Sequence, residues 1–231
     1  MTGWRFSPGG RAGGTDRRFT IASGCANLKS LPRPLPVSAM RDTESLPDPL
    51  PDRSCGECTV CCVALTIEDP ELRKAQGYRC KHLAREGGCG IYETRPDTCR
   101  TFYCGWRRLK WVRAPLRPDL SDVLIQLHWE TSQKDGSKRL GVAVTLLHRR
   151  GLKAEGLAET LAAAVAARAP VFLNIPGPPG FTMAQAKINA ALEAAVAARD
   201  KAGVLRIMTD LYVRGRGGPR KRVVLGSGPA G

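Results

Sequence analysis

The chain has 231 residues but no run of about 18 or more apolar residues, and it contains only three histidines. A helix needs about 20 mostly apolar residues to cross a bilayer, so the sequence predicts no membrane-spanning segment. Residues 1–24 contain arginines but no apolar stretch of the kind that a secretory signal requires. The sequence therefore predicts a cytoplasmic protein whose cysteines are held in a reducing environment.

Acidic residues are scarce, with 21 Asp and Glu against 36 Lys and Arg, and the net charge is +15. Residues 1–39 and residues 214–231 carry +5 each, which leaves +5 for the rest of the chain. Basic ends can contact nucleic acid or keep a protein soluble, and solubility is the preferred interpretation. No base-reading motif accompanies the charge, so nucleic acid is disfavoured as a partner. An adaptor that binds nucleic acid or a protein through its basic tail stays as an alternative.

Common catalytic signatures are also missing. The segment GPPG at residues 177–180 lacks the Lys-Ser/Thr ending of a phosphate-binding loop. No Cys/His pair has an identifiable third group that would orient it, so the sequence assigns no catalytic nucleophile. It leaves open whether the protein is an enzyme.

Composition divides the chain into four regions. Residues 1–54 are rich in Gly, Pro, Arg and Ser and predict a disordered leader, with Met40 as an alternative start of translation. Residues 55–113 form a cysteine module, residues 114–213 a small α+β region and residues 214–231 a basic tail. The predicted fold class is therefore α+β, with an irregular metal-binding module followed by a small sheet and helices.

Alternating and helical patterns predict the elements after the cysteine module. A β-hairpin is expected at residues 122–148, where two β-rich runs flank a polar segment with Asp-Gly. Two Ala-rich helices and a short strand should follow. The predicted ranges are a helix at 154–169, a strand within 170–180, a helix at 182–203 and a strand or helical turn at 204–214.

The cysteine module has weaker local signals. Residues 54–62 predict a loop that leads into a helix or turn, and residues 67–77 a helical turn with acids near its start. Pro96 predicts the start of a helix that bears Cys99. Trp106 and Trp111 are expected to cover the apolar side of the module.

Eight of the nine cysteines lie between residues 55 and 104, and Cys25 is excluded as too distant. The first three have the spacing C-x2-C-x2-C, which lets a tight loop point its sulfur atoms at one zinc ion or iron–sulfur cluster. Cys62 follows Cys61 directly, and neighbouring side chains diverge, so these two thiols are expected to face different centres. The eight thiols then divide into two sites of four, or into one site with spare cysteines. Disulfides are disfavoured because no export signal is present.

The segments CGECTVCC, CKHL and GCGIYETRPDTCRTFYC resemble the YkgJ-like CxxCxxCC family, whose members are described as zinc- or iron-chelating. The resemblance covers about residues 55–107, under a third of the chain. It implies a metal-binding set of seven cysteines, and Cys104 extends this set to eight. The set is Cys55, Cys58, Cys61, Cys62, Cys80, Cys89, Cys99 and Cys104. Some members are called Fe–S oxidoreductases without a defined reaction, and a related cluster occurs in longer flagellin lysine-N-methylases.

The predicted function is therefore a cytosolic protein that chelates zinc or iron, the latter as an ion or a 4Fe-4S cluster. The alternative is an Fe–S oxidoreductase or electron-transfer protein, because an all-thiolate ligand set serves both metals. Arg95 and Arg100 are candidates for neutralising the thiolates, or else they form surface ion pairs. His82 is an alternative metal ligand, whereas His128 is expected to be a sheet residue.

Overall fold

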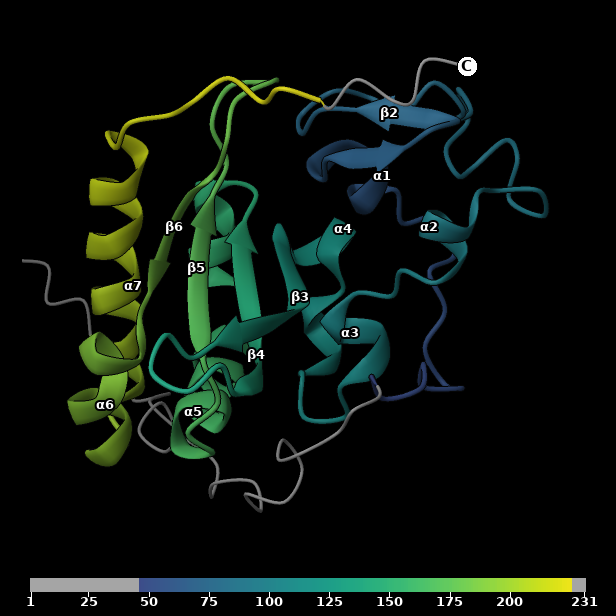
Figure 1. The fold of residues 1–231 in the computed structure, drawn as a ribbon. Helices are drawn as coiled ribbons and strands as arrows, with labels where there is room; N and C mark the ends of the chain where they lie inside the picture. Colours follow the sequence, from purple (N-terminus) through teal and green to yellow (C-terminus); the bar gives the residue numbers. More distant parts are fainter. Residues whose placement is uncertain (1–45, 226–231) are drawn as a thin grey trace, which may run out of the picture.

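The computed structural model describes residues 46–225, which form helices and two β-sheets (Figure 1). Short elements surround a two-stranded sheet in the cysteine module, and longer helices accompany a four-stranded sheet in the rest. This arrangement confirms the predicted α+β class. Residues 1–45 and 226–231 lie outside the described part, and so do the predictions made for Cys25, for Met40 and for most of the leader.

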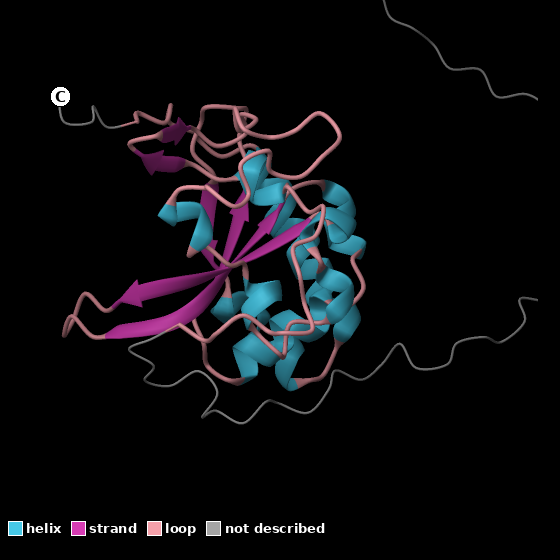
Figure 2. Ribbon diagram, turned by 90° about the vertical axis from the view of Figure 1, so that its right-hand side faces the viewer, coloured by secondary structure: helices cyan, strands magenta, loops and turns pink. Residues whose placement is uncertain are grey.

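Within residues 46–225, the larger sheet has the strand order β3-β4-β5-β6. β3 (Val123–Thr131) and β4 (Lys138–Leu146) form an antiparallel hairpin, and Gly136 in its turn has a φ of 69°. β5 (Val171–Ile175) runs parallel to β4, and β6 (Ala184–Lys187) pairs with β5 in the antiparallel sense. Figure 2 shows the hairpin reaching beyond the other strands. The predicted hairpin, its Asp-Gly turn and the strand after it are confirmed.

A parallel pair of strands needs a crossover connection, and here it consists of the 3₁₀ helix η3 (Arg149–Lys153) and the helix α5 (Leu157–Ala166). The Ala/Leu-rich sequence of α5 favours a helix, and nearly all of its residues are buried. α7 (Lys201–Arg216) packs against α5 and against β5 and β6. Figure 2 shows most helices on one side of the sheet.

One face of the sheet and these helices enclose the main hydrophobic core. Alternate residues of each strand point into it, as the period of two in a β-strand requires. The following core side chains are at most 1% exposed: Val123, Ile125, Val142, Val144, Leu161 and Met208.

The opposite face of the sheet carries a cluster of polar side chains. Asn174 donates a hydrogen bond to the Thr145 hydroxyl (3.4 Å) and accepts one from Gln185 (3.0 Å). Further along, the rings of His128 and Phe172 meet edge to face, with their centroids 4.5 Å apart. His128 is thus a sheet residue, as predicted.

The prediction of a helical turn at residues 67–77 is wrong. β1 (Ile67–Asp69) and β2 (Leu72–Lys74) form a short antiparallel hairpin there. The carboxylate of Asp69 accepts a hydrogen bond from the backbone N–H of Glu71 (3.0 Å), so the acids stabilise a turn rather than a helix start.

The prediction of one helix over residues 182–203 is also wrong. The segment contains β6 and a shorter helix, α6 (Asn189–Ala197), because pairing with β5 overrides the helix propensity of its first residues. Gly203 does not end a helix but lies in the first turn of α7, where Asp200 caps its N–H (2.8 Å). Residues 204–214 belong to α7 and are neither a strand nor a final turn.

The described ends of the chain are attached to the fold. In the predicted leader, Leu50 is buried and its N–H donates to the carbonyl of Arg107 (2.7 Å). The basic tail predicted from residue 214 begins inside α7. Beyond α7, Arg220 donates to the carbonyl of Gly215 (2.8 Å), and Val223 donates to that of Gly180 (2.8 Å). The described part of the tail is therefore held against the β5–β6 loop.

The cysteine module is joined to the sheet through α3 (Gly105–Arg108). A Cβ on Gly105 would come 2.6 Å from the Ile125 side chain, so the two surfaces are in close contact. Trp106 is buried in the hydrophobic core and Trp111 packs at its edge.

None of the helices described within residues 46–225 has the length and apolarity required to cross a membrane.

Candidate metal centre

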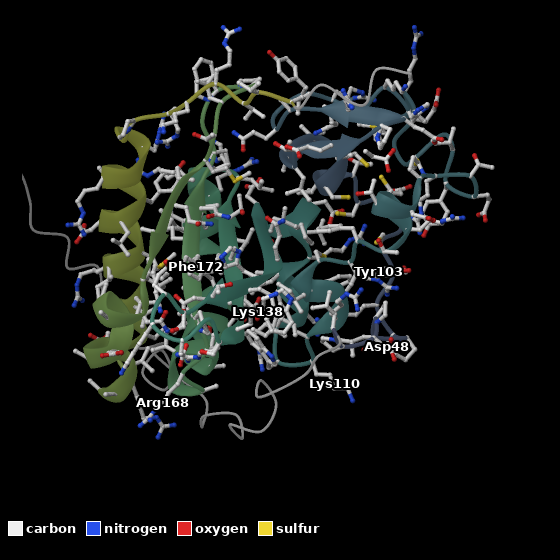
Figure 3. The ribbon with its side chains drawn as sticks, viewed as in Figure 1. Asp48, Tyr103, Lys110, Lys138, Arg168 and Phe172 are labelled. Carbon is white, nitrogen blue, oxygen red and sulfur yellow. The ribbon has the colours of Figure 1, made fainter. Side chains whose placement is uncertain are left out.

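A cavity of about 150 Å³ lies inside the cysteine module. Its walls come from α1 (Val60–Ala64), from the β1–β2 hairpin and from α2 (Asp97–Arg100). Figure 3 shows yellow sulfur atoms gathered in this part of the molecule. The thiols that line the cavity are Cys55, Cys58, Cys61, Cys62, Cys80, Cys89 and Cys99.

The backbone brings together thiols that are distant in sequence. In the C-x2-C-x2-C loop, the N–H of Cys58 donates to the carbonyl of Cys55 (2.9 Å), which makes the tight turn that the spacing predicts. The N–H of Cys80 donates to the carbonyl of Cys62 (3.0 Å). An isolated bridge between Leu83 and Cys89 then returns the chain to the cavity. The predicted loop leading into a helix at residues 54–62 is confirmed by α1.

Cys61 and Cys62 lie closer together than predicted, because a hydrogen bond links their side chains. This bond lowers the pKa of Cys62 to about 7 against the effect of burial, and the charges of Lys74 and Arg95 act in the same direction. The same bond, together with burial, raises the pKa of Cys61. The two thiols therefore meet in the cavity lining, and their assignment to different centres stays a prediction.

Cys104 is not part of the cavity lining but lies beside the thiols of the first loop. It precedes α3 at the N-cap position and packs against the hydrophobic core. Burial raises its pKa, and the charge of Cys55 adds to the effect. Burial also raises the pKa of Cys58 to about 11, with a contribution from Cys104. We name these neighbours the sheet-side set: Cys55, Cys58, Cys61 and Cys104.

The remaining thiols surround Cys99. Burial raises its pKa, and the charges of Cys62, Cys80 and Cys89 raise it further. Cys62, Cys80 and Cys99 lie near Lys74 at the end of β2, and so does Cys61 of the sheet-side set. We name the group around Cys99 the hairpin-side set: Cys62, Cys80, Cys89 and Cys99. The two sets meet at the linked pair Cys61 and Cys62.

Two cations, Arg95 and Lys74, lie near the cavity thiols. Arg95 lines the cavity, with its guanidinium 3.9 Å from the centroid of the Tyr92 ring. Arg100 instead forms an exposed ion pair with Asp97, which is the alternative that the sequence left open for it. Lys74 is only 7% exposed, and the charges of four cavity thiols reach it. The sequence does not single out Lys74, because only the alternation of Leu72 and Lys74 in a strand would indicate that its side chain is buried.

The Lys74 ammonium fixes the end of α1. It donates to the carbonyls of Val63 (3.2 Å), Leu65 and Ala75 (3.3 Å). Carbonyls at a helix end have no partner within the helix, so the cation satisfies groups that would otherwise be buried without one. Burial lowers the pKa of Lys74, and the neighbouring thiols oppose this effect.

We expect Lys74→Met to lower the free energy of unfolding by about 2 kcal/mol, because carbonyls that bound a charged group lose their donor. Urea denaturation followed by circular dichroism measures the change. Arg73→Met is the matched control, since Arg73 is the exposed neighbour on the same strand. Equal stability of the two variants would contradict the anchoring role.

His82 also lines the cavity and stays an alternative ligand. All eight described cysteines are free thiols. Within residues 46–225, however, no group of three or more His, Cys, Asp or Glu side chains is arranged so that it could hold a metal ion. The thiols share a cavity, but their sulfur atoms do not yet point at a common centre.

Comparison of the chain with family models, with curated proteins and with solved structures finds no match. The resemblance to the YkgJ-like family rests on the cysteine motif and stays a prediction.

Proposed function

We propose that the protein binds zinc or iron through the thiols of the cysteine module, in the cytoplasm. The observation that carries this proposal is one cavity lined by seven cysteines from three separate segments of the chain. The segments are residues 55–62, 80–89 and 99. A reducing compartment keeps such thiols available as ligands, whereas an oxidising one would pair them.

The donor set fits these metals. Zinc and iron–sulfur clusters both take four thiolates, and each of the two sets contains four cysteines. Four thiolates around a divalent ion carry a net negative charge, and Lys74 and Arg95 supply positive charge at the hairpin-side set. We therefore propose two centres, one for each set. Cys104 completes the sheet-side set. The resemblance implies the other seven ligands directly, and it implies Cys104 as an extension of that set.

The proposal requires the thiols to turn before a metal binds. Rotation of a cysteine between staggered rotamers moves its sulfur by roughly 3 Å. We propose that changes of this size bring the thiols of each set toward a common centre.

An iron–sulfur protein in electron transfer is the second candidate. The observation that favours it is that the proposed ligands are all sulfur, a set that serves clusters as well as zinc. A 4Fe-4S cluster would give a brown protein with a broad absorption near about 400 nm, whereas a zinc protein would be colourless.

The metal content of the full chain, purified without oxygen, tests the proposal. We expect about two zinc ions, or iron with sulfide for two clusters, per chain. Cys58→Ser should remove the metal of the sheet-side set, and Cys80→Ser that of the hairpin-side set. Cys25→Ser is the control and should leave the content unchanged. A chain that binds neither metal would overturn the proposed function, and one that binds a single equivalent would overturn the second centre only.

A further inference from the structure

A second cavity, of about 1000 Å³, lies at the end of the sheet away from the cysteine module. It is an open groove whose walls come from the start of β4, the end of α5, the end of β6 and α6. Figure 3 shows Arg168 at this lower end of the molecule. Four basic residues line the groove, against a single acid, Glu193. The basic residues are Arg139, Arg168, Lys187 and Arg199.

Two of these arginines occupy unusual backbone positions. Arg168 and Arg199 follow α5 and α6 with φ values of 56° and 55°, where glycine is the usual residue because it lacks a Cβ. Within residues 46–225, Asp122 is the one other non-glycine residue with a positive φ, and it forms an ion pair with Arg150 (2.9 Å). A strained position that keeps a long charged side chain at a cavity is a reason to look for a ligand.

Arg139 and Lys187 are held in place by partners on neighbouring segments. Arg139 donates to the carbonyl of Arg168, and Lys187 forms an ion pair with Glu130 (2.6 Å). Asn189 bridges the N–H of Val171 (2.8 Å) and the carbonyl of Ala169, which fixes the backbone beside the groove. The positive rim is therefore built on fixed elements rather than on a loose loop.

The floor of the groove is apolar and made of small side chains. Ala162, Val165 and Ala166 of α5 face Val196 and Ala197 of α6 across it. Among the described lining residues none is aromatic, so no platform for stacking a nucleobase is present. The lining also contains no glycine, so no run of glycine amides cradles a phosphate. An apolar floor beneath a cationic rim is instead complementary to a polypeptide with small apolar and acidic side chains.

We propose that this groove binds an acidic segment of a partner protein. Carboxylates of the segment pair with the Arg168 and Arg199 guanidinium groups, which accept a planar, two-pronged partner. Its small apolar side chains lie on the floor between α5 and α6. The groove is independent of the thiol cavity, so this proposal does not rest on metal binding.

A fluorescent 15-residue peptide of Glu, Ala and Leu in amphipathic helical order is the probe, and its anisotropy with the full chain is the measurement. The double variant Arg168→Gly/Arg199→Gly removes both side chains and relaxes both backbones, so lost binding would not reflect lost folding. We expect it to bind the peptide about tenfold more weakly than the wild type. Arg149→Ala, which removes an exposed arginine of η3, is the control and should bind as the wild type does.

Oligothymidylate of matched charge is the second probe. Weaker binding than the peptide, with no dependence on the two arginines, supports the proposal. Equal or tighter binding that the double variant abolishes would make the groove a general polyanion site and overturn it. The proposal would also be overturned if the wild type bound the peptide no more tightly than the double variant.

Discussion

Cys104→Ser should lower the thermal unfolding midpoint of the metal-loaded protein by about 10 °C or more, whereas Cys89→Ser should leave unfolding of the sheet nearly unchanged. The difference follows from where the two thiol sets lie. Cys104 packs against the hydrophobic core, and the neighbouring Gly105 contacts Ile125 of β3. A metal in the sheet-side set would therefore couple the module to the sheet. Circular dichroism and the fluorescence of the buried Trp106 follow the transition.

The substitution itself should not weaken α3, because serine is a good residue at the N-cap position that Cys104 occupies. An excess of chelator provides the control. Without metal, the variant and the wild type should unfold at similar temperatures. If the difference between the unfolding midpoints of the variant and the wild type persists in chelator, Cys104 acts through packing alone. If Cys89→Ser lowers the midpoint equally, the two sets do not differ in their coupling to the sheet.

The sequence was most informative where its pattern was long or specific. The β3–β4 hairpin could be predicted because two long runs flank an Asp-Gly turn, and α5 because ten residues of high helix propensity follow one another. Short elements were predicted less well. β1, β2 and β6 contain three or four residues each, and their pairing with a neighbouring strand outweighs local propensity.

The cysteines of the candidate site could be chosen from their spacing and from the resemblance, and seven of them do line one cavity. Their division into two sets could not be predicted, because it depends on how α1, α2 and the start of α3 lie in space. Lys74 was missed because a lysine in an unrecognised strand looks like any surface charge. The basic groove was missed because its four basic residues come from separate segments of the chain and share no motif.

Gly141→Ala should lower the free energy of unfolding by about 3 kcal/mol or more, and Gly141→Val should prevent accumulation of soluble protein. Gly141 lies in β4 opposite His128, and a Cβ there would come 2.1 Å from the carbonyl oxygen of Pro170. That oxygen accepts a hydrogen bond from the N–H of Val142 (2.8 Å) where β4 meets β5. The oxygen cannot move away without breaking this hydrogen bond between the parallel strands. The clash with a Cβ therefore lowers stability.

Urea denaturation of Gly141→Ala measures the loss, with Thr131→Val as the matched control. Thr131 is an exposed residue of the paired strand, so added apolar bulk there should change stability by no more than about 0.5 kcal/mol. The metal content of Gly141→Ala tests whether a change in the sheet affects the cysteine module. Because Gly141 lies in β4 and does not line the thiol cavity, any folded fraction should keep the metal content of the wild type. A denaturation midpoint equal to that of the wild type would show that β4 and β5 can separate at this point, against the close approach that the glycine permits.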